Sequence, residues 1–351
     1  LLEAAGATLD DMVRIEQFVL DRADAPAYFS ARNEFLVTDR PTSSMLVGHA
    51  LEVPDARIIL DGIAVARQEG WAKETFTTDK VPVNVRAGYS LGQRVGPLVF
   101  LPGNTASDFT TGIHPDARVD HTFWFERDIT KQTEFILKTR RVVLEEMGLG
   151  LGDVVQATVY LTDMADVAGF EDVWRRHFPV DGPALTVVPV DTLAVVGSIV
   201  EISVIALDPR NPFRRRMIES RHVPPPVTPG PQAVMAGPYL FLAGQLASDG
   251  QGLAREVEDN PALPYYASPI KRQTRHILRN VQRLCEAAGG SLESLVKCQA
   301  YFTDLSDLPA YFDAWAENFP ADPPASTAVG VKAPLPIPGC RVLQAWIGYI
   351  A

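Results

Sequence analysis

The sequence predicts an α+β fold in which one unit is repeated along the chain. Three segments share the order of a helix end, a glycine turn, an apolar strand, an aspartate and an aromatic-rich helix, and they are 4–37, 146–179 and 287–320. Gly6, Gly148 and Gly289 mark the same turn, at spacings of 142 and 141 residues. A repeat of this length has the size of a domain, whereas solenoid repeats are far shorter. We therefore expect several domain-sized units.

Each complete unit is expected to run strand, strand, helix, strand, helix, strand, strand. In the second unit we expect a long helix at 129–147 and strands at 83–91, 98–104, 154–161 and 199–207. The helices end at glycines, where a positive φ costs little. Strands and helices that are interleaved in this way form one sheet with two helices on one face. The other face must be buried, and the neighbouring units are the cover that we expect.

The units are expected to span 1–68, 80–209 and 218–351, with polar joints between them. The first unit opens at what is the end of a long helix in the other two. We therefore expect it to be only the C-terminal half of a unit. By the repeat spacing, the counterparts of 81–141 would precede Leu1, which suggests an incomplete chain.

Composition and charge exclude several classes of protein. A formal net charge of −11 repels polyphosphate, so we predict no nucleic-acid partner. No run approaches the roughly 18 apolar residues of a membrane helix, and we predict no membrane partner. The three cysteines lack CxxC spacing, which favours free thiols in a reducing cytoplasm over a disulfide framework or a metal site. We expect no cofactor.

Several motifs recur in the second and third units in the same order. The third unit carries AGQLASD and then AAGGSLESLVKCQAYFTD, and the second carries PGNTASD, GDVVQATVYLTD and VEISVIA. These motifs resemble the RidA (YjgF) family of enamine/imine deaminases. The resemblance implies tandem units of the RidA/chorismate-mutase-like fold. Because family members form trimers with ligand clefts between subunits, it also implies an intrachain pseudo-trimer, with further homo-oligomerisation left open.

The resemblance weakens at the residues that carry the family's chemistry. In the deaminases an arginine grips the substrate carboxylate, a bidentate task that suits its guanidinium. The matching positions here are Ser43, Leu185 and Ser326. The match implies that Ser43 contacts the substrate. It also implies slow turnover of simple 2-imino and enamine acids, because the clamp is lost.

Two further matches suggest catalytic residues. The family's water-positioning acid corresponds, by resemblance, to Asp61, Ser203 and Ala345, so only the first unit keeps an acid there. Tyr89 matches the family's tyrosine before the first core strand. The resemblance thus implies that Asp61 and Tyr89 act together in a cleft between the first and second units. The alternative is that Asp61 only bonds neighbouring backbone at a sheet edge.

Other side chains are candidates for ligand contacts. Arg86, three residues before Tyr89, is placed to replace the missing anion contact, and the alternative is a solvated charge at a strand edge. Two aromatic pairs precede the matched glutamines of the long helices, and they are Trp124 with Phe125 and Tyr265 with Tyr266. Such pairs suit a cleft for a flat ligand. Packing within or between units is the alternative.

These observations leave two hypotheses of different classes. The first is a divergent hydrolase, deaminase or lyase that acts on a small planar imine, enamine or carboxylate in a cleft between units. The second is a catalytically silent pseudo-trimer that binds a small metabolite or holds a partner enzyme. Loss of the clamp in every unit favours the second, whereas retention of Asp61 and Tyr89 favours one specialised cleft. We favour the enzyme, with a small molecule as its ligand.

Overall fold

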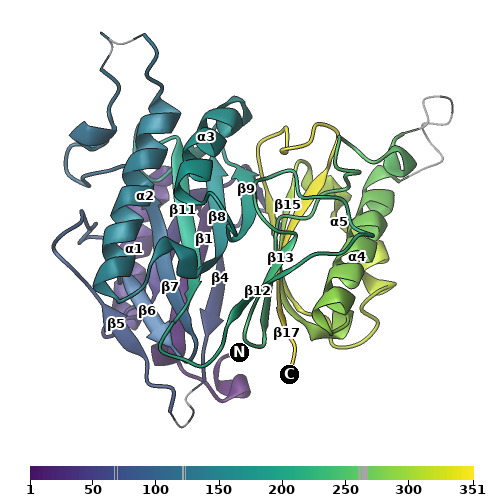
Figure 1. Cartoon of the computed structure of the whole chain (residues 1–351), viewed down its shortest axis with the longest axis horizontal. Coiled ribbons are helices and arrows are strands. Elements are labelled where there is room, and N and C mark those ends of the chain that lie inside the picture. The colour runs from purple at the N-terminus through teal and green to yellow at the C-terminus, as the bar shows by residue number, and fades with distance from the viewer. Residues whose placement is uncertain (67, 69, 121, 123, 260–261, 263–267) are drawn as a thin grey trace.

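Three β-sheets with helices on their outer side make up the computed structural model of the chain (Figure 1). It describes residues 1–351 except 67, 69, 121, 123, 260–261 and 263–267. The sheets have four, six and seven strands, and their end strands lie open, as in sheets and not barrels. The α+β organisation predicted from the repeats is therefore confirmed. No helix among the described residues is long and apolar enough to cross a membrane.

The first sheet is built around β1 (Met12–Val19). This strand pairs in parallel with β2 (Thr42–Val47) and antiparallel with β4 (Ile58–Ala64). Helix α1 (Ala25–Phe35) makes the crossover that a parallel pair requires. The fourth strand, β10 (Thr192–Leu193), comes from the second unit and pairs with β2. The first two units therefore share a sheet.

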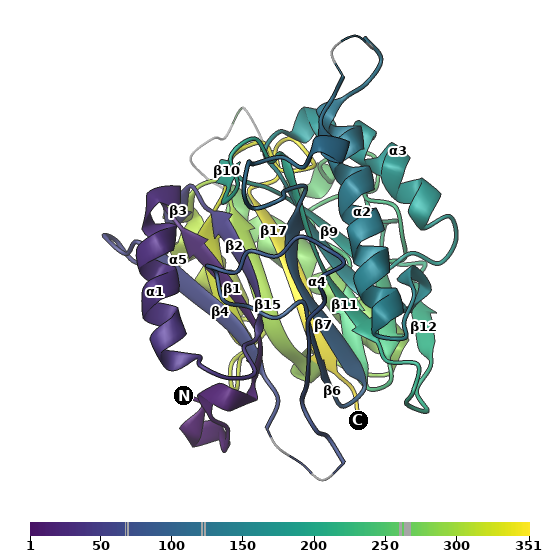
Figure 2. The same cartoon turned by 90° about the vertical axis from the view of Figure 1, so that its left-hand side faces the viewer.

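The second unit, together with β5 (Glu74–Phe76) from the joint before it, forms the six-stranded sheet and contributes two helices. In sheet order the strands are β5, β6 (Gly92–Val95), β7 (Leu98–Thr105), β11 (Val200–Leu207), β8 (Val154–Leu161) and β9 (Ala184–Pro189). The helices are α2 (Asp128–Glu146) and α3 (Val167–His177). Both helices pack on the same side of the sheet (Figure 2). This agrees with the two-helix, one-face arrangement predicted for a complete unit.

The third unit repeats this plan. Its strands, in sheet order, are β12 (Arg215–Ile218), β13 (Ala233–Ala236), β14 (Tyr239–Leu242), β17 (Val342–Tyr349), β15 (Leu295–Phe302) and β16 (Ala325–Gly330). Its helices are α4 (Pro269–Ala288) and α5 (Leu308–Ala316). The seventh strand, β3 (Ala50–Leu51), belongs to the first unit and pairs with β16. The first and third units therefore share a sheet as well.

Short 3₁₀ helices cap the turns of each unit. They are Glu3–Ala5, Leu9–Asp11, Arg22–Asp24, Pro115–Ala117, Leu151–Asp153, Met164–Asp166, Arg255–Val257, Leu292–Ser294 and Leu305–Asp307. The turn into β1, β8 and β15 is made each time by one of them, at Leu9–Asp11, Leu151–Asp153 and Leu292–Ser294. The recurrence of this local structure follows from the recurrence of the sequence motif.

The segment 83–91 is a turn and not the strand that its pattern predicted. The Asn84 side chain accepts hydrogen bonds from the backbone N–H groups of Arg86 and Ala87, at 3.2 and 3.3 Å. Gly88 follows with a φ of +59°, a conformation that favours glycine. A side chain that bonds its own backbone in this way competes with a β-ladder. The strand begins later, as β6, and pairs with β5 in the joint between units.

The sheet faces without helices bury one another. One cluster of buried side chains combines Val13 of the first unit, Val155 of the second and Phe241 of the third. A sheet with helices on one face needs a second layer on the other, and burial contributes about 25 cal/mol per Å² of apolar surface. The apolar strand faces are thus buried between units.

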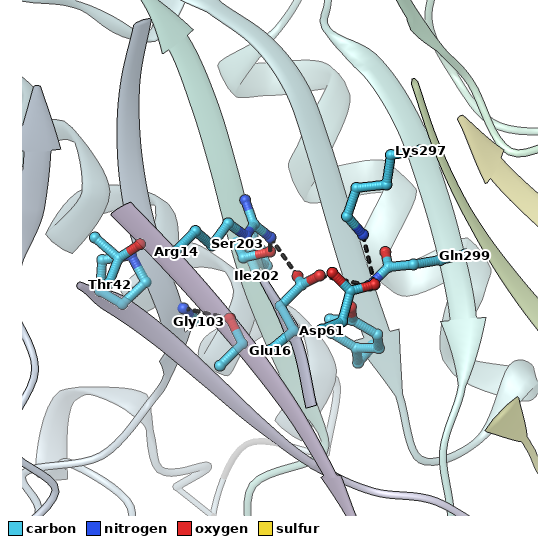
Figure 3. A network of polar contacts seen from close by, with 12 residues as sticks. Arg14, Glu16, Thr42, Asp61, Gly103, Ile202, Ser203, Lys297 and Gln299 are labelled. Atoms are coloured by element: carbon cyan, nitrogen blue, oxygen red, sulfur yellow. Dashed lines mark hydrogen bonds and ion pairs between the residues drawn. The ribbon is translucent and has the colours of Figure 1, made fainter. Parts of the chain in front are cut away.

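A polar network joins the three units inside this contact (Figure 3). Arg14 donates a hydrogen bond to the Ser203 hydroxyl at 2.7 Å and forms an ion pair with Glu16 at 2.5 Å. Gln299 donates to the other Glu16 oxygen at 2.6 Å. Burial alone would raise the pKa of the Glu16 carboxyl, but Arg14 and Lys297 outweigh burial and lower this pKa. The network therefore holds a buried, ionised carboxylate.

Removal of one partner of the Arg14–Glu16 pair is expected to cost more stability than removal of both charges. Arg14→Met leaves the Glu16 carboxylate buried without its main cation, which typically costs about 3–5 kcal/mol. In the double variant Arg14→Met/Glu16→Gln no charge remains unpaired, and much of the loss should be recovered. Urea unfolding at neutral pH measures both variants. A double variant no more stable than the single one would contradict this account.

Candidate functional site

A cavity of about 60 Å³ lies between the first and second units. The first unit lines it with Gln17, Ser43 and Met45, and the second lines it with Tyr89, Gly103 and Glu201. Strand β2 carries Ser43, and β11 carries Glu201. The backbone N–H of Gly103 donates to the Ser44 hydroxyl at 2.9 Å, which holds β7 against β2. The cavity is therefore built by the contact between two units.

The carboxyl of Glu201 is the acidic group of this cavity. It is 4% exposed. Burial raises its pKa to about 8, although the nearby Arg140 opposes the shift, and no hydrogen bond from the described residues stabilises the charge. A Cβ at position 103 would lie 1.9 Å from Glu201 Oε1, so glycine is required there. Glu201 is thus largely protonated at neutral pH and faces a small cavity.

Two buried arginines flank the cavity. Arg140 lies on α2, and its Nη2 donates to the backbone carbonyls of Pro102 and Ile202. Burial lowers the pKa of the Arg140 guanidinium to about 10, still well above neutrality. Among the described residues, neither Arg140 nor Arg32 forms an ion pair with a carboxylate. Both guanidinium groups are therefore buried without a carboxylate partner in the part of the chain that the structure describes, and neither arginine is among the residues that line the cavity.

Arg32 brings a guanidinium to Ser43 from helix α1. Its Nη1 donates to the Ser43 hydroxyl at 2.7 Å, and its Nη2 donates to the backbone carbonyl of Ala87. The guanidinium lies 5.3 Å from the ring centre of Tyr28 and 5.1 Å from that of Phe29. Cation–π contacts of this kind hold an arginine in place. Ser43 therefore has a guanidinium within hydrogen-bond distance, and this guanidinium comes from helix α1.

Tyr89 and Ser43 line the same cavity. Burial raises the pKa of the Tyr89 hydroxyl, so this group stays protonated. The backbone N–H of Asn84 reaches the hydroxyl at 3.5 Å. On the other side, Gln17 donates to the Ser43 hydroxyl at 2.8 Å and accepts from Tyr28 at 3.1 Å. Both predicted residues are thus brought into one site and held there.

The structure places Asp61 elsewhere. Its carboxylate forms an ion pair with Lys297 at 2.6 Å, where the first and third units meet (Figure 3). Asp61 does not line the cavity that contains Tyr89. The expected pairing of Asp61 with Tyr89 in one cleft therefore needs correction. The physical reason is that β4, which carries Asp61, faces the third unit, whereas β11 faces the first.

The other predicted ligand contacts that the structure describes do not line this cavity either. Arg86 is exposed in the turn before Tyr89. Trp124 and Phe125 are 91% and 66% exposed, and their rings meet edge to face with centroids 6.0 Å apart. The second aromatic pair, Tyr265 and Tyr266, falls outside the described residues. Ligand contacts by these five residues stay predictions.

The sequence contained signals for the two residues that were missed. Glu201 pairs with Tyr160 in the second sheet, and the equivalent pairs carry Ile59 and Leu343 in the other sheets. An acid in an otherwise apolar strand position is such a signal. Arg32 likewise occupies the helix position of a tryptophan in the other units, Trp174 and Trp315. Each of the two residues breaks the repeat at one position.

Comparison with known protein families decides the assignment. The sequence profile described as Endoribonuclease L-PSP matches residues 80–208 and 221–342, which together are more than half of the chain. The chain belongs to the endoribonuclease L-PSP family. Its relatives include RutC and RidA proteins, so the RidA resemblance inferred from the motifs is confirmed. The two matches make the chain a tandem member of the family.

Relatives of the family match about one third of the chain each. A RutC family protein of Pyrococcus horikoshii is 34% identical over 118 residues, covering 34% of this chain and 86% of its own length. A protein of Dermatophagoides farinae named 2-iminobutanoate/2-iminopropanoate deaminase is 30% identical over 117 residues, with 33% and 84% covered. A 3-aminoacrylate deaminase RutC of Acinetobacter baylyi is 30% identical over 117 residues, with 33% and 85% covered.

Solved structures of the family show the same proportion. RidA from Psychrobacter sp. PAMC 21119 is 32% identical and matches 38% of this chain and 99% of its own chain, with a TM-score of 0.33. A putative endoribonuclease of Thermotoga maritima is 25% identical and matches 39% of this chain and 98% of its own, also with a TM-score of 0.33.

Glu201 makes the stability of this L-PSP family member depend on pH in a defined direction. Its folded pKa of about 8 exceeds the value of about 4.3 in an unfolded chain, so folding binds a proton between these two values. The free energy of unfolding should therefore fall as pH rises from about 5 to about 8. Glu201→Gln removes this contribution. Urea unfolding across the window should show a smaller fall for the variant, and equal falls would count against a protonated Glu201.

Proposed function

We propose that the protein hydrolyses a small imine or enamine to a carbonyl compound and ammonia in the cleft between its first and second units. Family relatives named as deaminases of 2-iminobutanoate, 2-iminopropanoate and 3-aminoacrylate support the reaction class. The observation that carries the proposal is the buried Glu201 carboxyl, with a pKa of about 8, at an inter-unit cavity beside Tyr89. A cavity of about 60 Å³ suits a small substrate.

Glu201 is suited to move protons in both directions during such a reaction. Its carboxyl donates a proton to the imine nitrogen, or to the carbon of an enamine, and becomes a carboxylate. The carboxylate then accepts a proton from the water that adds to the imine carbon. Glu201 then donates this proton to the amine nitrogen, and the carbon–nitrogen bond breaks to release ammonia. The hydroxyl of the intermediate returns its proton to the Glu201 carboxylate as the carbonyl product forms, so the carboxyl is restored. A general acid–base group works best with a pKa near the working pH, and burial provides this for Glu201.

The arginines favour a substrate that carries a carboxylate. Arg32 replaces, from helix α1, the cation that is absent at Ser43, and it bonds Ser43 and the Ala87 carbonyl on the two sides of the cleft. Arg140 adds a second buried positive charge near Glu201. A guanidinium binds a carboxylate with directional hydrogen bonds. Arg32 therefore positions the Ser43 hydroxyl, and its positive charge attracts the substrate carboxylate.

We also propose that the units form a pseudo-trimer within one chain. Strand β10 of the second unit joins the sheet of the first, and β3 of the first unit joins the sheet of the third. Equivalent strands thus link neighbouring units in the same direction, which supports this arrangement. The apolar faces of all three sheets meet in one cluster. A cytoplasmic location stays a prediction, and one relative is named as mitochondrial.

Replacement of the Glu201 carboxyl by an amide should abolish most of the activity. With 2-iminobutanoate, 2-iminopropanoate or 3-aminoacrylate as substrate, Glu201→Gln is expected to lower kcat/KM about 10²- to 10⁴-fold, because it removes the acid–base group and keeps the shape. Asp61→Asn is the matched control, since Asp61 lies outside the cleft. Ammonia release measures both. A normal rate in Glu201→Gln, with a loss in Asp61→Asn, would move the chemistry to the first and third units.

Replacement of Arg32 by tryptophan, which the other units have at this helix position, tests whether Arg32 attracts the substrate carboxylate. Arg32→Trp is expected to fold, because Trp174 and Trp315 occupy the same helix position, and to raise KM more than kcat falls. The loss of a charged contact should cost tenfold or more in affinity, or about 1.4 kcal/mol. Arg86→Ala is the control, since Arg86 is exposed. Binding without turnover by the unaltered protein would instead support the silent metabolite-binding alternative.

A further inference from the structure

A phenylalanine with a left-handed backbone conformation follows strand β7. Phe109 has a φ of +55°, which is an unusual value for a bulky residue because its Cβ crowds the backbone. Strain of this kind persists only where the surrounding structure enforces it, and it is found most often at functional sites. Phe109 lines the inter-unit cavity that also contains Glu201 and Tyr89. The strained residue is therefore part of the candidate site.

Hydrogen bonds within the turn fix the backbone around Phe109. The Ser107 hydroxyl accepts a hydrogen bond from the backbone N–H of Phe109 at 2.8 Å. One oxygen of Asp108 accepts from the backbone N–H groups of Thr110 and Thr111, at 2.8 and 2.6 Å. These bonds hold the chain on both sides of residue 109. The turn therefore enforces the positive φ of this position.

The third unit builds the same turn with glycine. Its Ser248 hydroxyl accepts from the backbone N–H of Gly250 at 2.9 Å, and Asp249 accepts from the N–H groups of the two residues that follow. Gly250 is the repeat counterpart of Phe109, at the spacing of 141 residues. It has a φ of +90°, which glycine adopts at little cost. The second unit therefore carries an aromatic side chain at a position where the turn favours glycine.

The segment beside this turn also differs between the two units. A Cβ at Gly250 would lie 3.1 Å from Cδ of Pro225, which is closer than most such contacts. Counted from the Val-Pro dipeptide that both units carry, Pro225 corresponds to Val83. The third unit thus has a proline where a side chain at position 250 would extend. The second unit lacks this proline, and Phe109 reaches the cavity wall.

The remaining apolar lining of the cavity comes from the first unit and from the loop after β10. Phe29 of α1 and Met45 of β2 line the cavity together with Ala194 and Val195. Three of these residues, Phe29, Met45 and Ala194, belong to one apolar cluster. A hydrocarbon group gains free energy when it leaves water for such surroundings, whereas a polar group would lose hydrogen bonds. With Phe109, this lining favours a ligand that carries an aliphatic substituent.

We propose that Phe109 is a specificity-determining residue whose side chain contacts the aliphatic substituent of the substrate, while Glu201 and Tyr89 lie at the reacting carbon and nitrogen. The proposal rests on the function proposed above and adds a residue that selects among substrates. Glycine at position 109 would relieve the backbone strain but would leave this part of the wall without apolar surface. Substrates with longer unbranched side chains should therefore bind more tightly than 2-iminopropanoate.

Calorimetric titration with 2-oxopropanoate, 2-oxobutanoate and 2-oxopentanoate, the products of the corresponding imines, tests the proposal. Each added methylene is expected to raise the affinity of the unaltered protein about fourfold, as burial of one methylene does. In Phe109→Gly the gain per methylene should fall below about twofold, and the affinity for 2-oxopropanoate should change less than about threefold. Phe109→Leu keeps an apolar side chain and should retain most of the gradient.

Phe109→Gly is expected to fold, because Gly250 makes the same turn in the third unit. Its melting temperature should stay within about 3 °C of the original, because relief of the strain offsets the lost apolar contacts. An unchanged gradient in Phe109→Gly would overturn the role of Phe109 and leave the proposed function standing. An equal loss of affinity for all three ligands would do the same, since a merely structural role of Phe109 predicts that result.

The unaltered protein alone also separates the two proposals. Equal affinities for the three ligands would overturn the role of Phe109 without any variant. The expected gradient together with no turnover of the three imines would support the role of Phe109 in ligand selection and contradict the proposed reaction. No binding of any of the three ligands would overturn both.

Discussion

The open face of each sheet is the constraint on which the rest of the structure depends. Helices cover one face only (Figure 2), and the other face, which carries both an apolar cluster and the polar network, is buried against the other units. Val13, Val155 and Phe241, one from each unit, satisfy this constraint together. Because the units bury one another, every cleft between them is made by two units. Divergence of one unit therefore changes two clefts at once.

Repetition within one chain lets equivalent strand positions take different tasks. Glu16, Thr158 and Gln299 occupy the same position of their central strands by register. Glu16 is the buried anion of the network, and Gln299 is one of its donors. The same freedom allows β11 alone to carry an acid, Glu201, where the other sheets have apolar residues. In a trimer of identical chains such an acid would appear three times.

The repeat made much of the fold predictable, because spacing and motif order survive divergence. The sequence correctly indicated the α+β units, whereas the meeting of Ser43 and Tyr89 at one cavity emerged only from the structure. The motif alignment predicted Asp61 as the acid that acts with Tyr89, because such an alignment does not show which neighbouring unit a strand faces. It also missed Arg32, because a helix residue far from the expected arginine position reaches Ser43 only through the packing of α1. The pairing of β3 and β10 with the sheets of other units could likewise not be predicted, because the residue pattern of one strand does not show which sheet it joins.

We propose one functional site for the chain, the cleft between the first and second units. Calorimetric titration with 2-oxobutanoate, the product expected from 2-iminobutanoate, tests this claim directly by counting sites. We expect one site per chain, and we expect Ser43→Trp, which fills the cavity of about 60 Å³, to remove binding. Two or more sites per chain, or unchanged binding in Ser43→Trp, would contradict it.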